Sequence, residues 1–218
     1  MNLAPKAILV DLDGTLVDNT IAVAQTYYEC LIELGLKPLP LKTILSFSGK
    51  STYDTAKAMG VPQEYWDFVD SFFWDRFYEK ISSPKYHVKL IPGAKDFLKK
   101  CKSRKVPVGV VTSNNKKNAQ TILKKAEISK YIDALVTKDD VAKTKPDPEA
   151  LFRALKKLGI IISYDKSKLI WFIGDSETDY LAAKNANITF FMLGNHNRRY
   201  DIKTFIDFHE LMNSLCAI

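Results

Sequence analysis

The chain has 218 residues, of which 46% are hydrophobic and 26% are charged. This hydrophobic content is ample for a buried core, which excludes a wholly disordered chain. The formal net charge of +7 is spread along the sequence rather than gathered in one basic arm, which argues against a nucleic-acid partner and is compatible with a small anionic substrate.

Near-continuous apolar runs rich in β-branched or aromatic residues recur along the chain and predict strands that are buried on both faces, as in a parallel sheet. They lie at residues 7–10, 108–112, 134–137, 169–173 and 189–193. Helical patterns lie between the later runs, at residues 94–102, 116–126, 148–158 and 177–185. This alternation predicts an α/β fold with a doubly wound, Rossmann-like parallel sheet.

The first two predicted strands are separated by residues 11–107, a far longer connection than a simple crossover needs. Two stretches of it, TIAVAQTYYECLIELG and EYWDFVDSFFWDRFYEK, are helical in period and rich in aromatic residues. We therefore expect residues 17–85 to form a small α-helical cap domain inserted into a catalytic core of residues 1–16 and 86–218. Seven aromatic residues are expected to pack within the cap and between cap and core: Tyr65, Trp66, Phe68, Phe72, Phe73, Trp74 and Phe77.

The stretch LVDLDGTLVD places two carboxylates, Asp11 and Asp13, at the end of an apolar run. In an extended strand they would point to the same face. Like charges side by side are unfavourable unless a cation or a proton neutralises them or a reaction uses them. Further polar residues follow the later strands: Thr112, Ser113 and Asn114 after the second, Lys145 after the third, and Asp175 and Asp179 after the fourth.

The carboxyl ends of parallel strands meet at one edge of a sheet, so we expect these polar groups to gather there. Carboxylates, a hydroxyl and an ammonium are the groups needed to hold a divalent cation and a phosphoryl group. Taken singly, each is also compatible with helix capping or with a solvated loop lysine. Because these polar residues follow four predicted strands in order, we favour an active site.

Four motifs in this order, DLDGT, VVTSN, KTKPDP and GDSETD, resemble those of the haloacid dehalogenase-like hydrolases. The likeness covers nearly the whole chain and is strongest to the phosphoglycolate phosphatase-like branch, whose first motif also reads DGTLVD and whose helical cap is inserted after the first strand. The resemblance implies a magnesium-dependent phosphatase that hydrolyses a small phosphorylated metabolite, a phosphomonoester, through an aspartyl-phosphate intermediate.

The resemblance also implies a role for each acidic residue. Asp11 would be the nucleophile, and Asp13 would protonate the leaving group and then activate water. Mg²⁺ would take ligands from the side chains of Asp11 and Asp175 and from the backbone carbonyl of Asp13. Asp179 would support these ligands from behind.

Two further groups of residues are assigned to the substrate by the same resemblance. Thr112 and Lys145 would hold the transferring phosphoryl group, assisted by backbone amides near Leu12 and Asn114. Ser113 and Asn114 are accordingly expected to bind substrate.

The cap stretch SGKST, residues 48–52, is expected to face the part of the substrate that leaves. Gly49 allows a close backbone approach, while Lys50 and Ser51 supply hydrogen-bond donors. The alternative is that Lys50 starts the helix that follows and points to solvent.

The main alternative function is a sugar phosphomutase of the beta-phosphoglucomutase type, which shares the nucleophile, the acid/base and the cap. Such mutases carry DGV in the first motif and EDS in the fourth, whereas this chain has Thr15 and Gly174 there, which favours a phosphatase. A non-catalytic family member and a phospho-receiver-like signalling protein are further alternatives. The complete set of catalytic positions and the nucleophile on the first strand argue against both.

Cys30, Cys101 and Cys216 are odd in number and far apart, which predicts neither a disulfide framework nor a zinc site and favours a reducing cytosol. No apolar run approaches the length of a membrane span. Cleavage of the N-terminus as a signal peptide would remove or border Asp11 and Asp13. We therefore expect a cytoplasmic protein with no targeting segment and no membrane partner.

Overall fold

The structure is a computed structural model that describes residues 4–47, 49–161, 168–194 and 202–215. The chain divides into two compact units, one formed by Met1–Asp18 with Lys89–Ile218 and the other by Asn19–Val88. The second unit begins two residues after the expected start at residue 17 and ends three residues after the expected end at residue 85.

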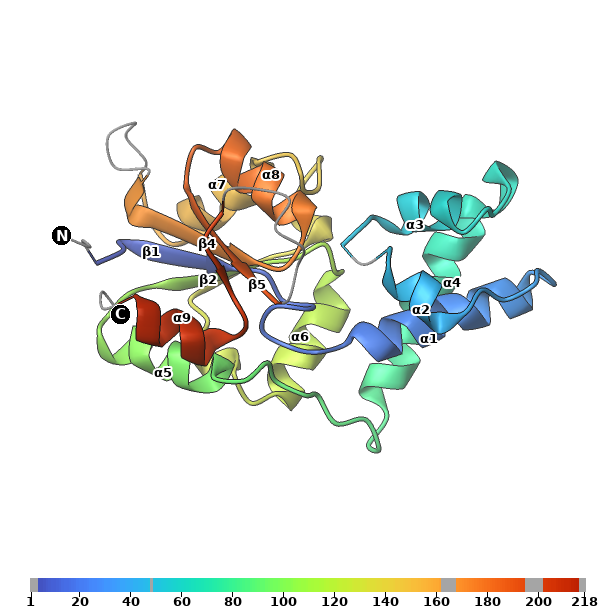
Figure 1. The fold of residues 1–218 in the computed structure, drawn as a ribbon, viewed down its shortest axis with the longest axis horizontal. Coiled ribbons are helices and arrows are strands. Elements are labelled where there is room, and N and C mark those ends of the chain that lie inside the picture. Colours follow the sequence, from blue (N-terminus) through green and yellow to red (C-terminus); the bar gives the residue numbers. More distant parts are fainter. Residues whose placement is uncertain (1–3, 48, 162–167, 195–201, 216–218) are drawn as a thin grey trace. The chain divides into compact units, whose positions relative to one another are not determined.

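The first unit is built on a six-stranded parallel sheet with the strand order β3-β2-β1-β4-β5-β6 (Figure 1). The strands are β1 (Ala7–Val10), β2 (Val108–Val111), β3 (Ala134–Val136), β4 (Ile170–Gly174), β5 (Thr189–Leu193) and β6 (Thr204–Phe205). In the sheet, Ile8 of β1 is in register with Val108 of β2 and Trp171 of β4. The strand order reverses at β1, and this switch point is where ligands bind in doubly wound folds.

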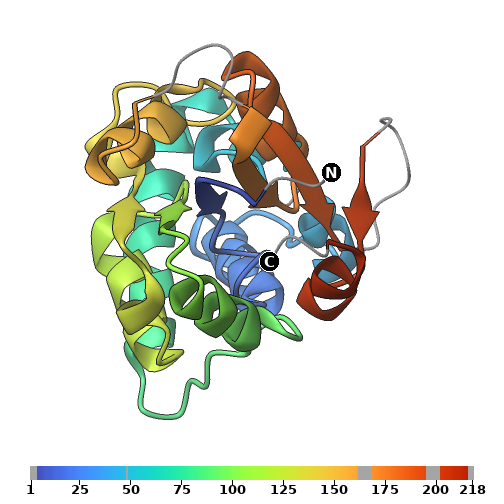
Figure 2. The same cartoon turned by 90° about the vertical axis from the view of Figure 1, so that its left-hand side faces the viewer.

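Helices cover both faces of this sheet, as Figures 1 and 2 show. One face carries α7 (Glu149–Lys157) and α8 (Glu177–Asn185), and the other carries α5 (Ala94–Ser103), α6 (Lys116–Lys125) and α9 (Phe208–Ser214). Every residue of β1, β2 and β4 is buried, as expected for strands covered on both faces. The predicted α/β class with a doubly wound sheet is therefore confirmed.

The last strand and helix, β6 and α9, were not predicted from the sequence. A strand of two residues is too short to show a period. Helix α9 does carry a start signal, since Asp207 is its N-cap and accepts a hydrogen bond from the Glu210 backbone N–H at 3.0 Å. The short 3-10 helices η2 (Ser129–Tyr131) and η3 (Lys138–Asp140) were not predicted either.

The second unit is helical throughout its described elements, in agreement with the composition of the inserted segment. These are α1 (Thr20–Glu33), α2 (Leu41–Leu45), α3 (Thr52–Ala58), η1 (Gln63–Tyr65) and α4 (Trp66–Ser82). Its aromatic core stacks Tyr27 on Phe73, with ring centroids 4.3 Å apart, and Phe73 on Phe77. Tyr65 and Phe68, which the sequence grouped with these aromatics, are exposed.

Cys30 and Cys101 are buried free thiols, and burial raises the pKa of each to about 12. They are therefore protonated and unreactive at neutral pH. Cys216 lies outside the described residues. None of the helices described is long and apolar enough to cross a membrane.

Candidate active site

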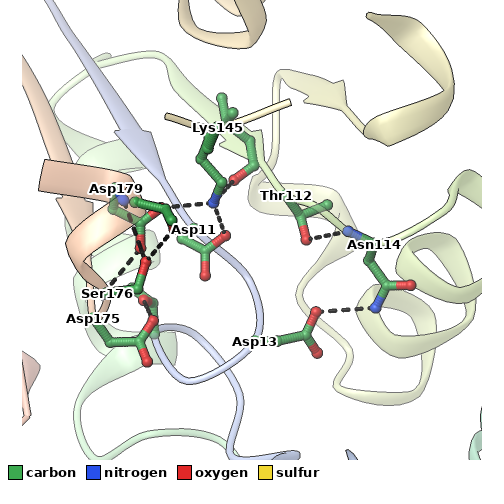
Figure 3. Close-up of polar contacts among 11 residues, drawn as sticks. Asp11, Asp13, Thr112, Asn114, Lys145, Asp175, Ser176 and Asp179 are labelled. Carbon is green, nitrogen blue, oxygen red and sulfur yellow. Dashed lines mark hydrogen bonds and ion pairs between the residues drawn. The ribbon is translucent and has the colours of Figure 1, made fainter. Parts of the chain in front are cut away.

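The polar residues singled out in the first unit meet at the carboxyl edge of its sheet (Figure 3). Asp11 directly follows β1, Thr112 follows β2 and Asp175 follows β4, while Lys145 comes from the loop between β3 and α7. The short parallel strands thus bring together side chains that are far apart in the sequence.

Lys145 lies between two carboxylates at the centre of the site. Its Nζ is 2.6 Å from Oδ1 of Asp11 and 2.6 Å from Oδ1 of Asp179, and only 4% of its side chain is exposed. Burial alone lowers the pKa of Lys145, but the two carboxylates outweigh burial and hold the pKa above its ordinary value. The lysine is therefore a fixed positive charge at neutral pH, with its position set by both partners.

The carboxyl groups of Asp11 and Asp175 resist ionisation. Burial is the largest cause that raises the pKa of Asp11 well above its usual value, and the charges of Asp179 and Asp175 add to the effect against the attraction of Lys145. Burial and the Asp179 charge likewise raise the pKa of Asp175 to about 7, although Thr15 Oγ1 donates a hydrogen bond to Asp175 Oδ1 at 3.0 Å. Without a further cation, the site carries more negative charge than its surroundings stabilise.

The donor set fits a hard divalent cation. One carboxylate oxygen from each of Asp11, Asp175 and Asp179 lies within 4.8 Å of the others, and carboxylate oxygens are the ligands that Mg²⁺ prefers. The loop after β1 leaves room here because Gly14 has no Cβ and adopts a positive φ of 88°. A Cβ at that position would lie 2.2 Å from Asp175 Oδ2.

The N-terminus of α8 holds Asp179 in place. Ser176 is the N-cap, and its Oγ donates a hydrogen bond to Asp179 Oδ2 at 2.5 Å while accepting one from the Asp179 backbone N–H at 3.2 Å. The other carboxylate oxygen of Asp179 accepts from Lys145. The capping interpretation of this motif is confirmed through one carboxylate oxygen, while the other oxygen contacts Lys145 and leaves the functional role a prediction.

The loop after β2 supplies a hydroxyl and an amide. Thr112 is buried, and its Oγ1 accepts a hydrogen bond from the Asn114 backbone N–H at 3.1 Å, which leaves the hydroxyl proton available to another acceptor. Asn114 Nδ2 donates to Asp13 Oδ2 at 2.9 Å. Asn114 is expected from the sequence to bind substrate, and its contact with Asp13 was not predicted, because no local spacing connects residues so far apart. Ser113 of the same loop is half-buried.

The remaining candidates, Gly49, Lys50 and Ser51, belong to the second unit, and their contact with substrate stays a prediction. Ser51 is the N-cap of α3 and accepts a hydrogen bond from the Asp54 backbone N–H at 3.1 Å. Lys50 is exposed and precedes the helix rather than starting it, since α3 begins at Thr52. Ser48, at the head of this stretch, lies outside the described residues.

Comparisons with known proteins identify relatives of this chain by sequence and by structure. The family model described as haloacid dehalogenase-like hydrolase matches residues 8–193. The pyrophosphatase PpaX of Bacillus velezensis is 32% identical, over 83% of this chain and 79% of its own length. A phosphoglycolate phosphatase of Pseudomonas fluorescens is 29% identical, over 84% of this chain and 67% of its own length.

Among solved structures, a putative phosphoglycolate phosphatase from Lactobacillus plantarum superposes with a TM-score of 0.84 at 21% identity, covering 97% of this chain and 99% of that chain. This likeness shows the shared fold. The match to the family model extends over all four motifs of the sequence, and it confirms the expected resemblance and the expectation of a hydrolytic enzyme. The chain belongs to the haloacid dehalogenase-like hydrolase family.

Proposed function

We propose that this protein is a magnesium-dependent phosphatase that hydrolyses a small phosphomonoester through an aspartyl-phosphate at Asp11. The observation that carries the proposal is the arrangement around Lys145, whose ammonium lies 2.6 Å from the Asp11 carboxylate at the switch point of the sheet. A nucleophilic carboxylate, a fixed cation and a set of acidic cation ligands are the parts that phosphoryl transfer needs. The curated relatives named above are phosphatases.

In the first half-reaction, a carboxylate oxygen of Asp11 attacks phosphorus and the bond to the leaving alkoxide breaks. Asp13 in its protonated form gives its proton to that oxygen, so the leaving group departs as an alcohol. The Lys145 ammonium and the Thr112 hydroxyl proton compensate the charge on the phosphoryl oxygens.

In the second half-reaction, Asp13 is a carboxylate and takes a proton from a water molecule. The oxygen of that water attacks phosphorus, the bond from phosphorus to the Asp11 oxygen breaks, and inorganic phosphate is released. Asp11 is restored as a free carboxylate, and Asp13 is protonated again for the next substrate.

Asp11, Asp175 and the backbone carbonyl of Asp13 would hold Mg²⁺, and Asp179 would orient these ligands while it keeps Lys145 in place. When bound, Mg²⁺ neutralises phosphoryl oxygens and the acidic cluster itself. The crowding of three carboxylates, together with the raised pKa values of Asp11 and Asp175, supports such a site.

We propose a small phosphorylated metabolite as substrate, with Gly49, Lys50 and Ser51 contacting the part that leaves. Phosphoglycolate and pyrophosphate, the substrates named for the relatives, are the first candidates.

A mutase is less well supported, because a Cβ at Gly174 would lie 2.6 Å from the Cβ of Asp179. The glutamate that such mutases carry at this position would not fit beside Asp179. The buried, unpaired Cys30 and Cys101 suit a reducing cytosol.

The test is a panel of phosphate compounds that includes phosphoglycolate, pyrophosphate, sugar phosphates and nucleoside monophosphates. Free phosphate is measured with Mg²⁺ and with excess chelator, for the wild type and for Asp11→Asn. We expect phosphate release that requires both Mg²⁺ and Asp11. Conversion of one sugar phosphate into its isomer without phosphate release would show a mutase, and undiminished release in chelator or by Asp11→Asn would overturn the mechanism.

A further inference from the structure

We propose that Asn114 is a positioning residue that holds the Asp13 carboxylate in place for proton transfer. The inference rests on the proposed function, in which Asp13 exchanges protons with the leaving group and with water. Figure 3 shows the Asn114 amide nitrogen directed at Asp13 and the amide oxygen directed away from it. The distance from Nδ2 to Asp13 Oδ2 is 2.9 Å.

Asn114 is itself held firmly, so it is a suitable anchor. Its backbone N–H donates to Thr112 Oγ1 at 3.1 Å, and its backbone carbonyl accepts from the Lys138 N–H at 3.0 Å. Only 4% of the residue is exposed. A donor fixed in this way loses little further freedom when it orients another side chain.

The position of Asp13 explains why it needs an anchor. The strand ends at Val10, so Asp13 lies in the turn that follows and is only partly buried. A hydrogen bond from a fixed donor to one carboxylate oxygen restricts rotation of the group. The carboxyl group of Asp13 then keeps one orientation for proton transfer in both half-reactions.

The amide oxygen of Asn114 indicates that this side chain has a functional rather than a structural role. Among the described residues, the buried Oδ1 of Asn114 has no hydrogen-bond partner. A buried acceptor without a partner destabilises the fold, and an apolar side chain of similar shape would avoid that cost. The donor directed at Asp13 is the contact that such a replacement would lose.

The main test is Asn114→Leu, which keeps the shape of the side chain and removes both polar atoms. For an alkyl phosphate we expect kcat to fall about 10- to 100-fold with little change in KM. The melting temperature should stay the same or rise. For p-nitrophenyl phosphate, whose leaving group needs no proton, the single-turnover rate of aspartyl-phosphate formation should fall much less.

A double-mutant cycle separates a positioning role from an independent one. Adding Asn114→Leu to Asp13→Ala should lower the rate by less than about 2-fold, because the residue to be positioned is already gone. The matched control is Asn115→Ala in the same loop. Asn115 is the N-cap of α6 and accepts from the Asn118 backbone N–H at 2.8 Å, so its loss should lower the melting temperature and leave the ratio of alkyl to aryl rates unchanged.

Equal losses from Asn114→Leu with and without Asp13, or a rate that falls only in step with the melting temperature, would overturn the positioning role. Failure of the proposed function would look different. In that case the wild type would release no phosphate from any ester, or Asp13→Ala would be as active as the wild type.

Discussion

Asp11 and Asp13 raised the question of why two acids end a buried strand, and the structure gives each its own partner. Asp11 pairs with Lys145, whereas Asp13 accepts from Asn114. The expectation that side chains at i and i+2 share a face does not apply to Asp13, because β1 ends at Val10 and the chain turns afterwards. Asp11 thus has a cationic partner and Asp13 an amide partner, and this difference suits a nucleophile and an acid/base.

Asp11→Asn should reduce phosphate release by at least about 1,000-fold, because an amide is a poor nucleophile and a weaker cation ligand. The melting temperature of the metal-free protein should not fall, since burial already disfavours the Asp11 charge. Steady-state rates and thermal unfolding check both statements. Asp96→Asn, at an exposed aspartate paired with Lys99, is the control that should change neither.

Lys145→Ala should impair both folding and activity. It leaves Asp11 and Asp179 buried without their cation, which costs about 3–5 kcal/mol of unfolding free energy, and kcat should fall by at least about 100-fold. Denaturant unfolding and rate measurements test this. Lys157→Ala is the matched surface control, because Lys157 is 3.0 Å from Asp140 but 44% exposed, and its loss should cost less than about 1 kcal/mol. A similar cost for the two variants would contradict the structure.

At the scale of single elements, the sequence predicted those whose signal is local. Buried strands appear as continuous apolar runs, and β5 and α8 have the bounds expected from the sequence. The strand β6 was missed because its two residues acquire their conformation from pairing with β5. Site residues followed from motif order at the strand ends, whereas the Asn114 to Asp13 contact depends on the tertiary fold and leaves no local pattern.

The start of α8 combines a helix cap with a hydrogen bond to a residue of the candidate active site. Ser176→Ala removes the N-cap and a hydrogen bond to Asp179, so we expect a loss of about 1 kcal/mol in stability and about 10-fold in kcat. Asp207→Ala removes the comparable N-cap of α9 and should cost similar stability without the loss in rate. Denaturant unfolding and kcat are measured on both variants. Equal rates for the two would show that Ser176 serves only the helix.

At the scale of the whole molecule, the proposed role of the helical unit in substrate selection can be tested at Lys50. Lys50→Ala should lower kcat/KM for the preferred substrate by about 10- to 100-fold and affect an aryl phosphate much less, because an exposed cation on the cap would bind the leaving part. Lys57→Ala, in the last turn of α3, is the matched control. Unchanged kinetics for Lys50→Ala on both substrates would assign Lys50 to solvent.

The last prediction concerns the pH dependence of stability in the metal-free protein. The Asp175 pKa is raised to about 7 in the fold, from a usual value of 3.8. Well below pH 3.8 the group is protonated in both states and has no effect. As the pH rises from 4 to 7, the unfolded chain ionises while the folded chain resists, so the fold loses stability across this window and the loss is complete above pH 7.

Asp175→Asn isolates this effect from the other groups that titrate. Without metal, the variant and the wild type should have similar melting temperatures at pH 4, and the variant should be more stable at pH 8, by a few kcal/mol at most. Mg²⁺ should raise the melting temperature of the wild type more at pH 8 than at pH 5, because cations bind ionised carboxylates, and should do little for the variant. Thermal unfolding at three pH values with Mg²⁺ or chelator measures all of these differences. A pH-independent difference between the two proteins would show that burial does not raise the Asp175 pKa. Equal stabilisation of both proteins by Mg²⁺ would show that Asp175 is not a cation ligand.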